Sequence, residues 1–184
     1  MCFTKAGARE IPIVHHKMGG IFVDKINNMS DMYPEHRTVM DNFIGITYEK
    51  SKNTTCKIMR EAKYHWEEDV EETREPDISI ICTDRKRRKL VYTCVPRFIA
   101  EVLSDSTEKT DRGVKMDLYC KIGVEEYWII DWRKRTIERY LLSDDCDKYI
   151  LHDIINDDNK DELRILSFPI IDINFDELFD VSDY

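Results

Sequence analysis

Two carboxylates and one lysine occupy positions at which they could carry out phosphodiester chemistry. Asp77 opens the apolar run PDISIIC, and Glu101 lies inside a second apolar run, FIAEVLS. An unpaired charge in such a run is costly, because a buried carboxylate loses its hydration. A divalent cation shared with Asp77 would neutralise Glu101, and hard oxygen ligands suit Mg²⁺ or Mn²⁺. Lys115 follows on the next predicted helix and would place a positive charge near a phosphate, so the three residues predict metal-dependent phosphodiester hydrolysis.

The predicted helix over residues 105–123 must position that lysine. Asp111, Lys115 and Tyr119 follow one another at intervals of four residues, so they share one face of an α-helix. Gly123 stands where a helix of this kind commonly ends. This shared face could be oriented toward the carboxylates of Asp77 and Glu101. The alternative is a solvent-exposed Asp–Lys pair beside a packed tyrosine.

A strand-rich sheet with at least two helices is expected around these residues. Pro34 stands at the start of a predicted amphipathic helix over residues 34–50, whose apolar residues recur at three- and four-residue spacing. Runs with strand character cover residues 56–62, 63–70, 76–82, 96–104, 125–131, 135–142, 149–155 and 163–172. The sequence therefore predicts an α/β protein of the α+β kind.

One domain over residues 1–184 is expected, because a chain of this length can bury a single core. Within it, residues 1–30 are predicted to form an N-terminal arm and residues 33–142 the core. Residues 143–184 are predicted to form C-terminal strands and an acidic end.

The overall charge restricts how nucleic acid could be bound. The chain carries 28 basic and 37 acidic residues, and its net charge of −9 argues against a protein that coats nucleic acid through basicity alone. Any such contact must be local. The basic run at residues 85–89 could make such a contact. It is interpreted either as a solvated hairpin turn or as a segment that contacts phosphates. It consists of Arg85, Lys86, Arg87, Arg88 and Lys89.

Apolar runs and cysteine spacing indicate the compartment. No apolar run approaches the ~18 residues that a membrane-spanning helix needs, and the first residues lack the long apolar core of a signal peptide. The six cysteines include no Cys-x-x-Cys pair, which argues against a zinc site and a short disulfide framework. We expect a cytoplasmic protein with no membrane partner. Its cysteines are expected to be reduced and to pack as small apolar side chains.

Four motifs in a fixed order resemble those of a known family. They are Pro76-Asp77, EVLS-x-ST at residues 101–107, Asp-x3-Lys-x3-Tyr at residues 111–119, and GVEEYWIID at residues 123–131. The series closely resembles the Uma-two family of restriction endonuclease-like proteins, a branch of the PD-(D/E)XK nuclease superfamily. The similarity extends from about His36 to Leu142.

The resemblance implies a restriction endonuclease-like fold, in which helices flank a mixed central β-sheet, and Mg²⁺ or Mn²⁺ as cofactor. It implies that Asp77, Glu101 and the backbone carbonyl of Val102 are metal ligands. Leu103 occupies the superfamily's usual lysine position, and the resemblance implies that Lys115 takes over that role. Residues that could extend the metal shell or orient water are Glu35, His36, Glu61, Asp111 and Tyr119.

The leading hypothesis is a Mg²⁺-dependent endonuclease that hydrolyses phosphodiester bonds in DNA, with Asp77, Glu101 and Lys115 as catalytic residues. The alternative is a catalytically inactive nuclease-like domain that binds nucleic acid or a protein. A homodimer is also expected, because a double-strand break requires two active sites and closed twofold assemblies are common. The apolar surface predicted to pair two subunits is that of a strand and of the run at residues 135–142 that follows it. The strand residues are Tyr127, Trp128, Ile129 and Ile130.

Overall fold

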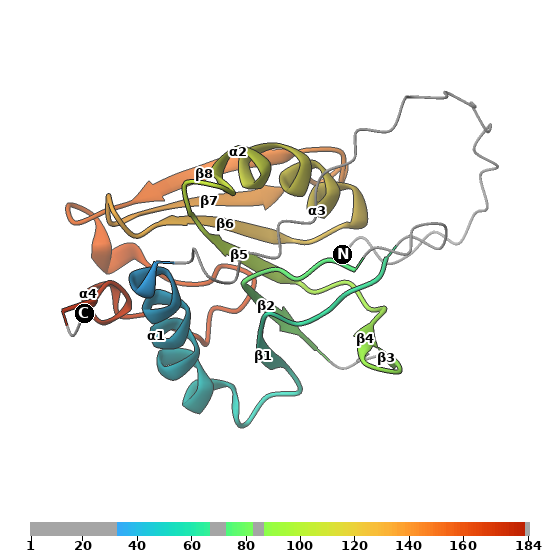
Figure 1. Ribbon diagram of the computed structural model, residues 1–184, viewed down its shortest axis with the longest axis horizontal. Helices are drawn as coiled ribbons and strands as arrows, with labels where there is room; N and C mark the ends of the chain where they lie inside the picture. The colour runs from blue at the N-terminus through green and yellow to red at the C-terminus, as the bar shows by residue number, and fades with distance from the viewer. Residues whose placement is uncertain (1–32, 67–72, 83–86, 183–184) are drawn as a thin grey trace. The chain divides into compact units, whose positions relative to one another are not determined.

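A six-stranded mixed sheet runs through the described part of the chain (Figure 1). The computed structural model describes residues 33–66, 73–82 and 87–182. The strands follow the order β1-β2-β5-β6-β7-β8. They are β1 (Lys57–Arg60), β2 (Ile78–Ile81), β5 (Phe98–Val102), β6 (Glu126–Asp131), β7 (Thr136–Leu142) and β8 (Tyr149–Ile155). The predicted mixed sheet with flanking helices is confirmed.

β5 and β6 are the parallel pair in an otherwise antiparallel sheet. Parallel neighbours need a crossover connection. Here it consists of α2 (Glu108–Thr110), the π-helical turn η1 (Asp111–Lys115) and α3 (Met116–Ile122). Gly123 ends α3 with a φ of 89°, as predicted. The prediction of an uninterrupted α-helix is wrong at η1, because a π turn bonds each N–H one residue farther back than an α-helix does.

Both faces of the central strands are covered, so every residue of β5 and β6 is buried. α1 (Pro34–Ser51) and α4 (Phe175–Leu178) cover one face, and α3 covers the other (Figure 1). Phe43 of α1 stacks on Phe98 of β5, with 5.8 Å between the ring centroids. α1 begins at Pro34 as predicted, because proline's missing N–H and fixed φ suit the first helical position.

The position of β6 in the middle of the sheet corrects the predicted dimer contact. β6 pairs with β5 on one side and with β7 on the other. Its apolar side chains belong to the core and cannot meet a second subunit, whereas Ile150 on the edge strand β8 is 52% exposed. The homodimer itself stays a prediction. The predicted contact residues, each at most 1% exposed, are Tyr127, Trp128, Ile129 and Ile130.

The C-terminal third contains fewer strands than predicted. β8 forms as expected, but residues 163–172 contribute only an isolated bridge between Arg164 and Asp172. Pro169 lies within this run and lacks the N–H that a strand ladder needs. The acidic end contains α4, where the Asn174 side chain accepts the Glu177 N–H at 3.2 Å and so caps the helix.

Two other predictions fall wholly or partly outside the described residues. The strand predicted over residues 63–70 is reduced to isolated bridges made by Tyr64, and residues 67–72 are not described. The N-terminal arm predicted over residues 1–30 also lies outside them. The described residues belong to one compact unit, Met32–Tyr184. Within them, no helix has the length and apolar character needed to cross a membrane.

Cys56 and Cys82 are joined by a disulfide, which contradicts the expectation that the cysteines are reduced. The two residues flank the β1–β2 pair, in which Lys57 lies opposite Ile81. This antiparallel register places Cys56 directly opposite Cys82. Spacing along the chain could not indicate the pairing, because the two cysteines are 26 residues apart. Among the described residues, Cys94 and Cys120 form no disulfide and remain thiols.

Candidate active site

Asp77 and Glu101 meet where β2 begins and β5 ends. The strands are antiparallel with Ile78 opposite Ala100, so Asp77 lies opposite Glu101. The backbone N–H of Asp77 donates to Glu101 Oε2 at 3.4 Å. Asp77 Oδ2 in turn accepts the Val102 N–H at 2.8 Å. The structure thus brings the two predicted carboxylates together beside the Val102 backbone, while a role for the Val102 carbonyl stays a prediction.

The Glu101 carboxylate is buried and makes two close contacts. Tyr119 donates its hydroxyl to Oε1 at 2.6 Å, and Lys115 Nζ lies 3.0 Å from Oε2. Burial raises the pKa of Glu101 well above its usual range; the Lys115 charge opposes this rise, and Asp77 and Asp111 add to it. A bound cation would therefore interact favourably here, because it would stabilise the ionised carboxylate.

The ammonium group of Lys115 lies between two buried carboxyl groups, those of Glu101 and Asp111. Its Nζ lies 2.7 Å from Asp111 Oδ1, and the Asp111 side chain is 1% exposed. Burial alone would lower the pKa of Lys115, but Glu101, Asp111 and Asp77 raise it above its usual value. The raised pKa keeps Lys115 protonated at neutral pH, so its side chain carries a positive charge. Three acids thus surround one ammonium group, and a bound cation would favour the ionised forms of these acids.

Asp111, Lys115 and Tyr119 lie on one face as predicted, although η1 interrupts the α-helix. Lys115 contacts both Asp111 and Glu101, and Tyr119 contacts Glu101. The alternative of a solvent-exposed Asp–Lys pair is wrong, because Asp111 is buried. Tyr127 of β6 fixes the turn further by donating its hydroxyl to the Asp111 carbonyl at 3.0 Å.

An ion pair that no sequence pattern indicated holds η1 against the sheet. Arg112 donates to Glu138 Oε2 of β7 at 2.6 Å, and Tyr140 donates its hydroxyl to the same oxygen at 2.6 Å. Arg112 also reaches Glu108 at 3.2 Å. Arg112 and Glu138 are 26 residues apart and belong to different elements, so only the tertiary structure reveals their contact.

His36 reaches the carboxylate pair from the face that α1 covers. Its Nε2 lies 3.3 Å from Asp77 Oδ2, and its side chain is 3% exposed. Its Nδ1 is buried and has no hydrogen-bond partner within the described residues. Glu35 has a buried Oε2 that is equally unpartnered within that part of the chain. Of these two predicted positions, His36 is the one that contacts Asp77.

Glu61 contacts the site with its backbone, not with its side chain. Its N–H donates to the Asp77 carbonyl at 3.0 Å, and its φ of 48° lies in the left-handed region. Its carboxylate lies 3.3 Å from Arg60 Nε and is 45% exposed. The structure therefore pairs the Glu61 side chain with Arg60.

Residues 22–175 match a family whose description is Uma2, "Putative restriction endonuclease". The chain belongs to the Uma2 family. The "Uncharacterized protein slr1290" of Synechocystis sp. is 36% identical over 78 residues, which make up 42% of this chain and 41% of that protein. The match to this curated relative thus spans about two fifths of the relative's length.

A solved structure shares the fold of this Uma2 chain. It is the crystal structure of a "putative nuclease belonging to DUF820" from Anabaena variabilis. The two chains agree with a TM-score of 0.64 over 80% of this chain and 82% of that chain, at 16% sequence identity. At this low identity the likeness shows the fold alone.

The carboxylate site of the Uma2 chain has a donor set that fits a hard cation. Within the described residues, no group of three or more His, Cys, Asp or Glu side chains is placed to hold one metal ion. Asp77 and Glu101 contribute two carboxylates, and Mg²⁺ in proteins usually binds one or two carboxylates together with water and substrate phosphates. These residues therefore fit Mg²⁺ or Mn²⁺ better than zinc, which prefers three or four protein ligands.

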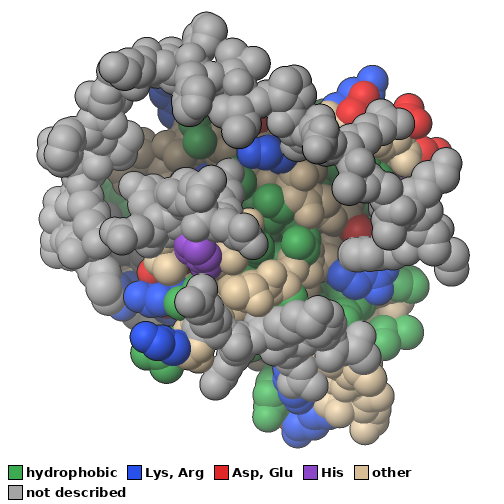
Figure 2. Space-filling view, turned by 90° about the vertical axis from the view of Figure 1, so that its right-hand side faces the viewer, with side chains coloured by type: hydrophobic (Ala, Val, Ile, Leu, Met, Phe, Trp, Pro, Cys, Tyr) green, Lys and Arg blue, Asp and Glu red, His purple; other side chains and the backbone are tan. Residues whose placement is uncertain are grey.

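The predicted phosphate-binding run lies in a short hairpin. β3 (Arg87–Arg88) pairs with β4 (Val91–Tyr92) around Lys89, whose φ is 58°. The hairpin prediction is confirmed there, while Arg85 and Lys86 lie outside the described residues. On the face shown in Figure 2, the described Lys and Arg side chains lie at separate places and form no single basic patch. The phosphate contact stays a prediction.

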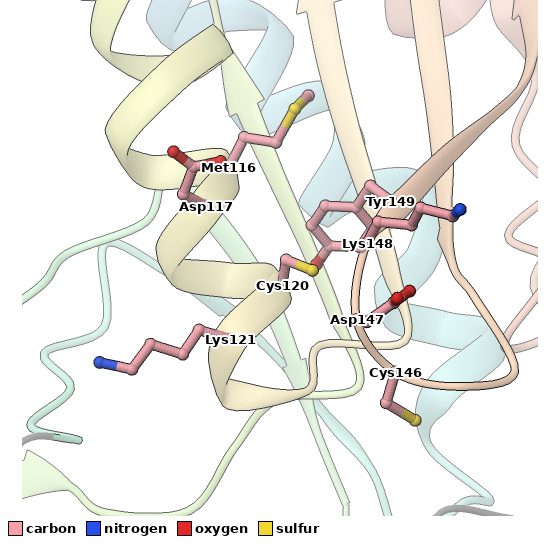
Figure 3. Close-up of a pocket in the computed structure, with 8 residues that line it drawn as sticks. All are labelled: Met116, Asp117, Cys120, Lys121, Cys146, Asp147, Lys148 and Tyr149. Carbon is pink, nitrogen blue, oxygen red and sulfur yellow. The ribbon is translucent and has the colours of Figure 1, made fainter. Parts of the chain in front are cut away.

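A cavity of about 520 Å³ lies between α3 and the start of β8 (Figure 3). Cys120 points toward Tyr149 there, whereas Lys121 points away. The lining includes Met116 and Cys120, each of which follows a site residue and so lies about 100° farther around the helix. No predicted metal ligand lines the cavity, so it is separate from the carboxylate site.

Proposed function

We propose that this Uma2 chain is a Mg²⁺-dependent endonuclease that hydrolyses phosphodiester bonds in DNA. The observation that carries the proposal is the convergence of Asp77, Glu101 and Lys115 at one end of β2 and β5. The carboxylates of Asp77 and Glu101, with the Val102 carbonyl, would hold the cation. A bound Mg²⁺ in such a site makes a water molecule a better nucleophile and polarises the scissile phosphate.

The side chains have distinct roles in this proposal. Lys115 supplies a fixed positive charge near the phosphate, where negative charge develops in the transition state. Tyr119 holds Glu101 through its hydrogen bond to Oε1. His36 and the Val102 N–H both contact Asp77 Oδ2 and so restrict the rotation of that carboxylate. The groups are thereby positioned before substrate arrives, which lowers the cost of ordering them in the reaction.

Cleavage of plasmid and single-stranded DNA in Mg²⁺ or Mn²⁺ tests the proposal. The wild-type protein should cut, and D77N should lose cleavage because one of the two carboxylate ligands is gone. D145N is a matched control, since Asp145 is an exposed residue of the turn between β7 and β8. It should fold and cut normally. Cleavage that survives in D77N would contradict the assignment of the site.

Calorimetric titration with Mn²⁺ distinguishes the proposed enzyme from the second candidate function. That candidate is a nuclease-like domain that binds nucleic acid or a protein without cutting. That candidate is favoured by one observation: Lys115 lies 3.0 Å from Glu101 and already pairs with the buried carboxylate. A nuclease should show a Mn²⁺ site that E101Q abolishes. DNA binding with neither Mn²⁺ uptake nor cleavage would favour the binding domain.

A further inference from the structure

Tyr33 and Trp132 form an aromatic pair at the end of the sheet where β5 and β6 end. Their ring centroids lie 5.9 Å apart, and the ring planes are tilted by 52°. Trp132 is half-buried and packs against the core beneath α1, whereas Tyr33 is 47% exposed. The pair therefore combines an anchored indole with a phenol ring that remains open to a ligand.

Chain connections place this aromatic pair at the same end of the sheet as Asp77. The Tyr33 carbonyl accepts the N–H of His36 at 3.1 Å, and His36 Nε2 lies 3.3 Å from Asp77. Trp132 directly follows the last residue of β6. Because β6 is parallel to β5 with Val102 opposite Ile130, Trp132 lies at the end of the sheet where β5 also ends.

Polar contacts hold Tyr33 in place and offset part of the charge of the acids around it. The Tyr33 hydroxyl donates to Asp105 Oδ2 at 3.3 Å. Arg133 ion-pairs with Asp105, with Asp131 at 3.2 Å and with Glu108 at 3.7 Å. The carboxylates at this end of the sheet thus share a guanidinium, which reduces their repulsion of a polyanionic strand.

We propose that Tyr33 and Trp132 form a stacking platform for an unpaired nucleobase next to a phosphate at the Asp77–Glu101 site. The inference rests on the proposed nuclease function and names its substrate class, a single strand or a frayed duplex end. Base–aromatic stacking tolerates any sequence, because every base has a π-face. A base inside a duplex keeps its faces covered by its neighbours and must leave the stack to be bound in this way.

Binding of fluorescent oligonucleotides, measured by anisotropy with Ca²⁺ in place of Mg²⁺, tests the platform. Y33A should bind a single-stranded oligonucleotide about 10-fold more weakly than wild type, the size expected for one stacked base. Y33F keeps the ring and should bind like wild type. Y48A is the matched control, since Tyr48 is a 55% exposed tyrosine of the same helix, about 20 Å farther along.

Three comparisons decide the outcome. The Y33A effect should be small on a fully paired duplex and on an oligonucleotide with consecutive abasic sites. Equal affinities of Y33A and Y48A for the single strand would overturn the platform. A loss in Y33F as large as that in Y33A would also overturn it, because the Asp105 hydrogen bond rather than the ring would then matter. A change in self-association in Y33A, with unchanged DNA affinity, would show a protein contact instead and overturn it too.

The platform and the nuclease function can fail separately. A wild-type protein that binds single strands through Tyr33 but never cuts would overturn the nuclease and leave the platform. A wild-type protein that cuts, while Y33A keeps the same preference between single-stranded and duplex DNA, would do the opposite. Thermal unfolding of Y33A at wild-type temperature confirms that the fold is intact.

Discussion

Lys115 Nζ lies 3.0 Å from Glu101 Oε2, and the two side chains come from different elements on the same face of the sheet. The ammonium thus pairs with the carboxylate that is proposed to hold a cation. Because the surrounding acids raise the pKa of Lys115, its charge is present throughout the neutral range.

K115A should therefore lose turnover while keeping near-normal affinity for DNA and Mg²⁺. The charge of Lys115 matters most as the transition state develops, so we expect cleavage to slow by about 10²–10³-fold. K115R, which keeps a positive charge, should recover part of the rate. Single-turnover cleavage and DNA binding measured on the same samples check this. Equal losses of binding and rate in K115A would point to a folding defect instead.

E126A should destabilise the fold without involving the active site. The buried Glu126 carboxylate accepts hydrogen bonds from Trp128 Nε1 at 2.7 Å, Leu166 N–H at 3.1 Å and Ser167 N–H at 2.6 Å. Its loss leaves one buried and two part-buried donors unpaired, so the free energy of unfolding should fall by about 3 kcal/mol. E125A is the neighbouring control.

Glu125 pairs with Arg97 at a half-exposed position, where an ion pair contributes about 1 kcal/mol or less. Urea denaturation of both variants supplies the comparison. Similar stabilities of E126A and E125A would show that the C-terminal segment does not depend on the buried carboxylate.

Glu138 should make part of the stability depend on pH. Burial would raise its pKa, but hydrogen bonds from Arg112 and Tyr140 lower it below its unfolded value of 4.5. The folded state then binds fewer protons than the unfolded state, so this contribution is fully present above about pH 4.5 and is lost as the pH falls through the folded-state pKa.

The advantage of wild type over E138Q in free energy of unfolding should therefore shrink on acidification. Urea denaturation at several pH values between about 3 and 6 measures it. An advantage that grows toward low pH would have the wrong sign for a carboxylate stabilised in its ionised form.

The Cys56–Cys82 disulfide should stabilise the β1 edge of the sheet. It closes a loop between residues 26 positions apart, and a loop of this size typically contributes about 3 kcal/mol. C56S/C82S should unfold at lower urea than wild type under oxidising conditions, with the difference reduced by dithiothreitol. C94S/C120S, which removes two thiols that form no disulfide, is the control. Identical midpoints for wild type and C56S/C82S would mean that the disulfide contributes no stability in solution.

The β3–β4 hairpin can be tested independently of the metal site. If Arg87 and Arg88 contact phosphates, neutralising both should weaken DNA binding similarly for all sequences. The salt dependence should flatten by about 0.9 per lost contact on duplex DNA. Mn²⁺ binding should not change. An unchanged salt slope would assign Arg87–Arg88 to a solvated turn.

Local pattern in the sequence determined the elements and the chemical identity of the site. Alternating and helical periodicities predicted α1, β5, β6 and β7, because side-chain burial follows the strand and helix repeats. The motifs around Asp77, Glu101 and Lys115 predicted which groups would meet. Gly123 as a helix terminator is likewise a local property, since its positive φ depends on one residue.

Strand register and long-range packing were decided by the tertiary structure alone. The pairing of Ile78 with Ala100 sets Asp77 opposite Glu101, and the pairing of Lys57 with Ile81 brings Cys56 and Cys82 together. Nothing along the chain encodes such a register locally, because it depends on which strand each element finds as its neighbour. The wrong prediction for β6 has the same cause. Its apolar residues are compatible with either a core strand or a subunit contact, and only its pairing with β7 shows that it is a core strand.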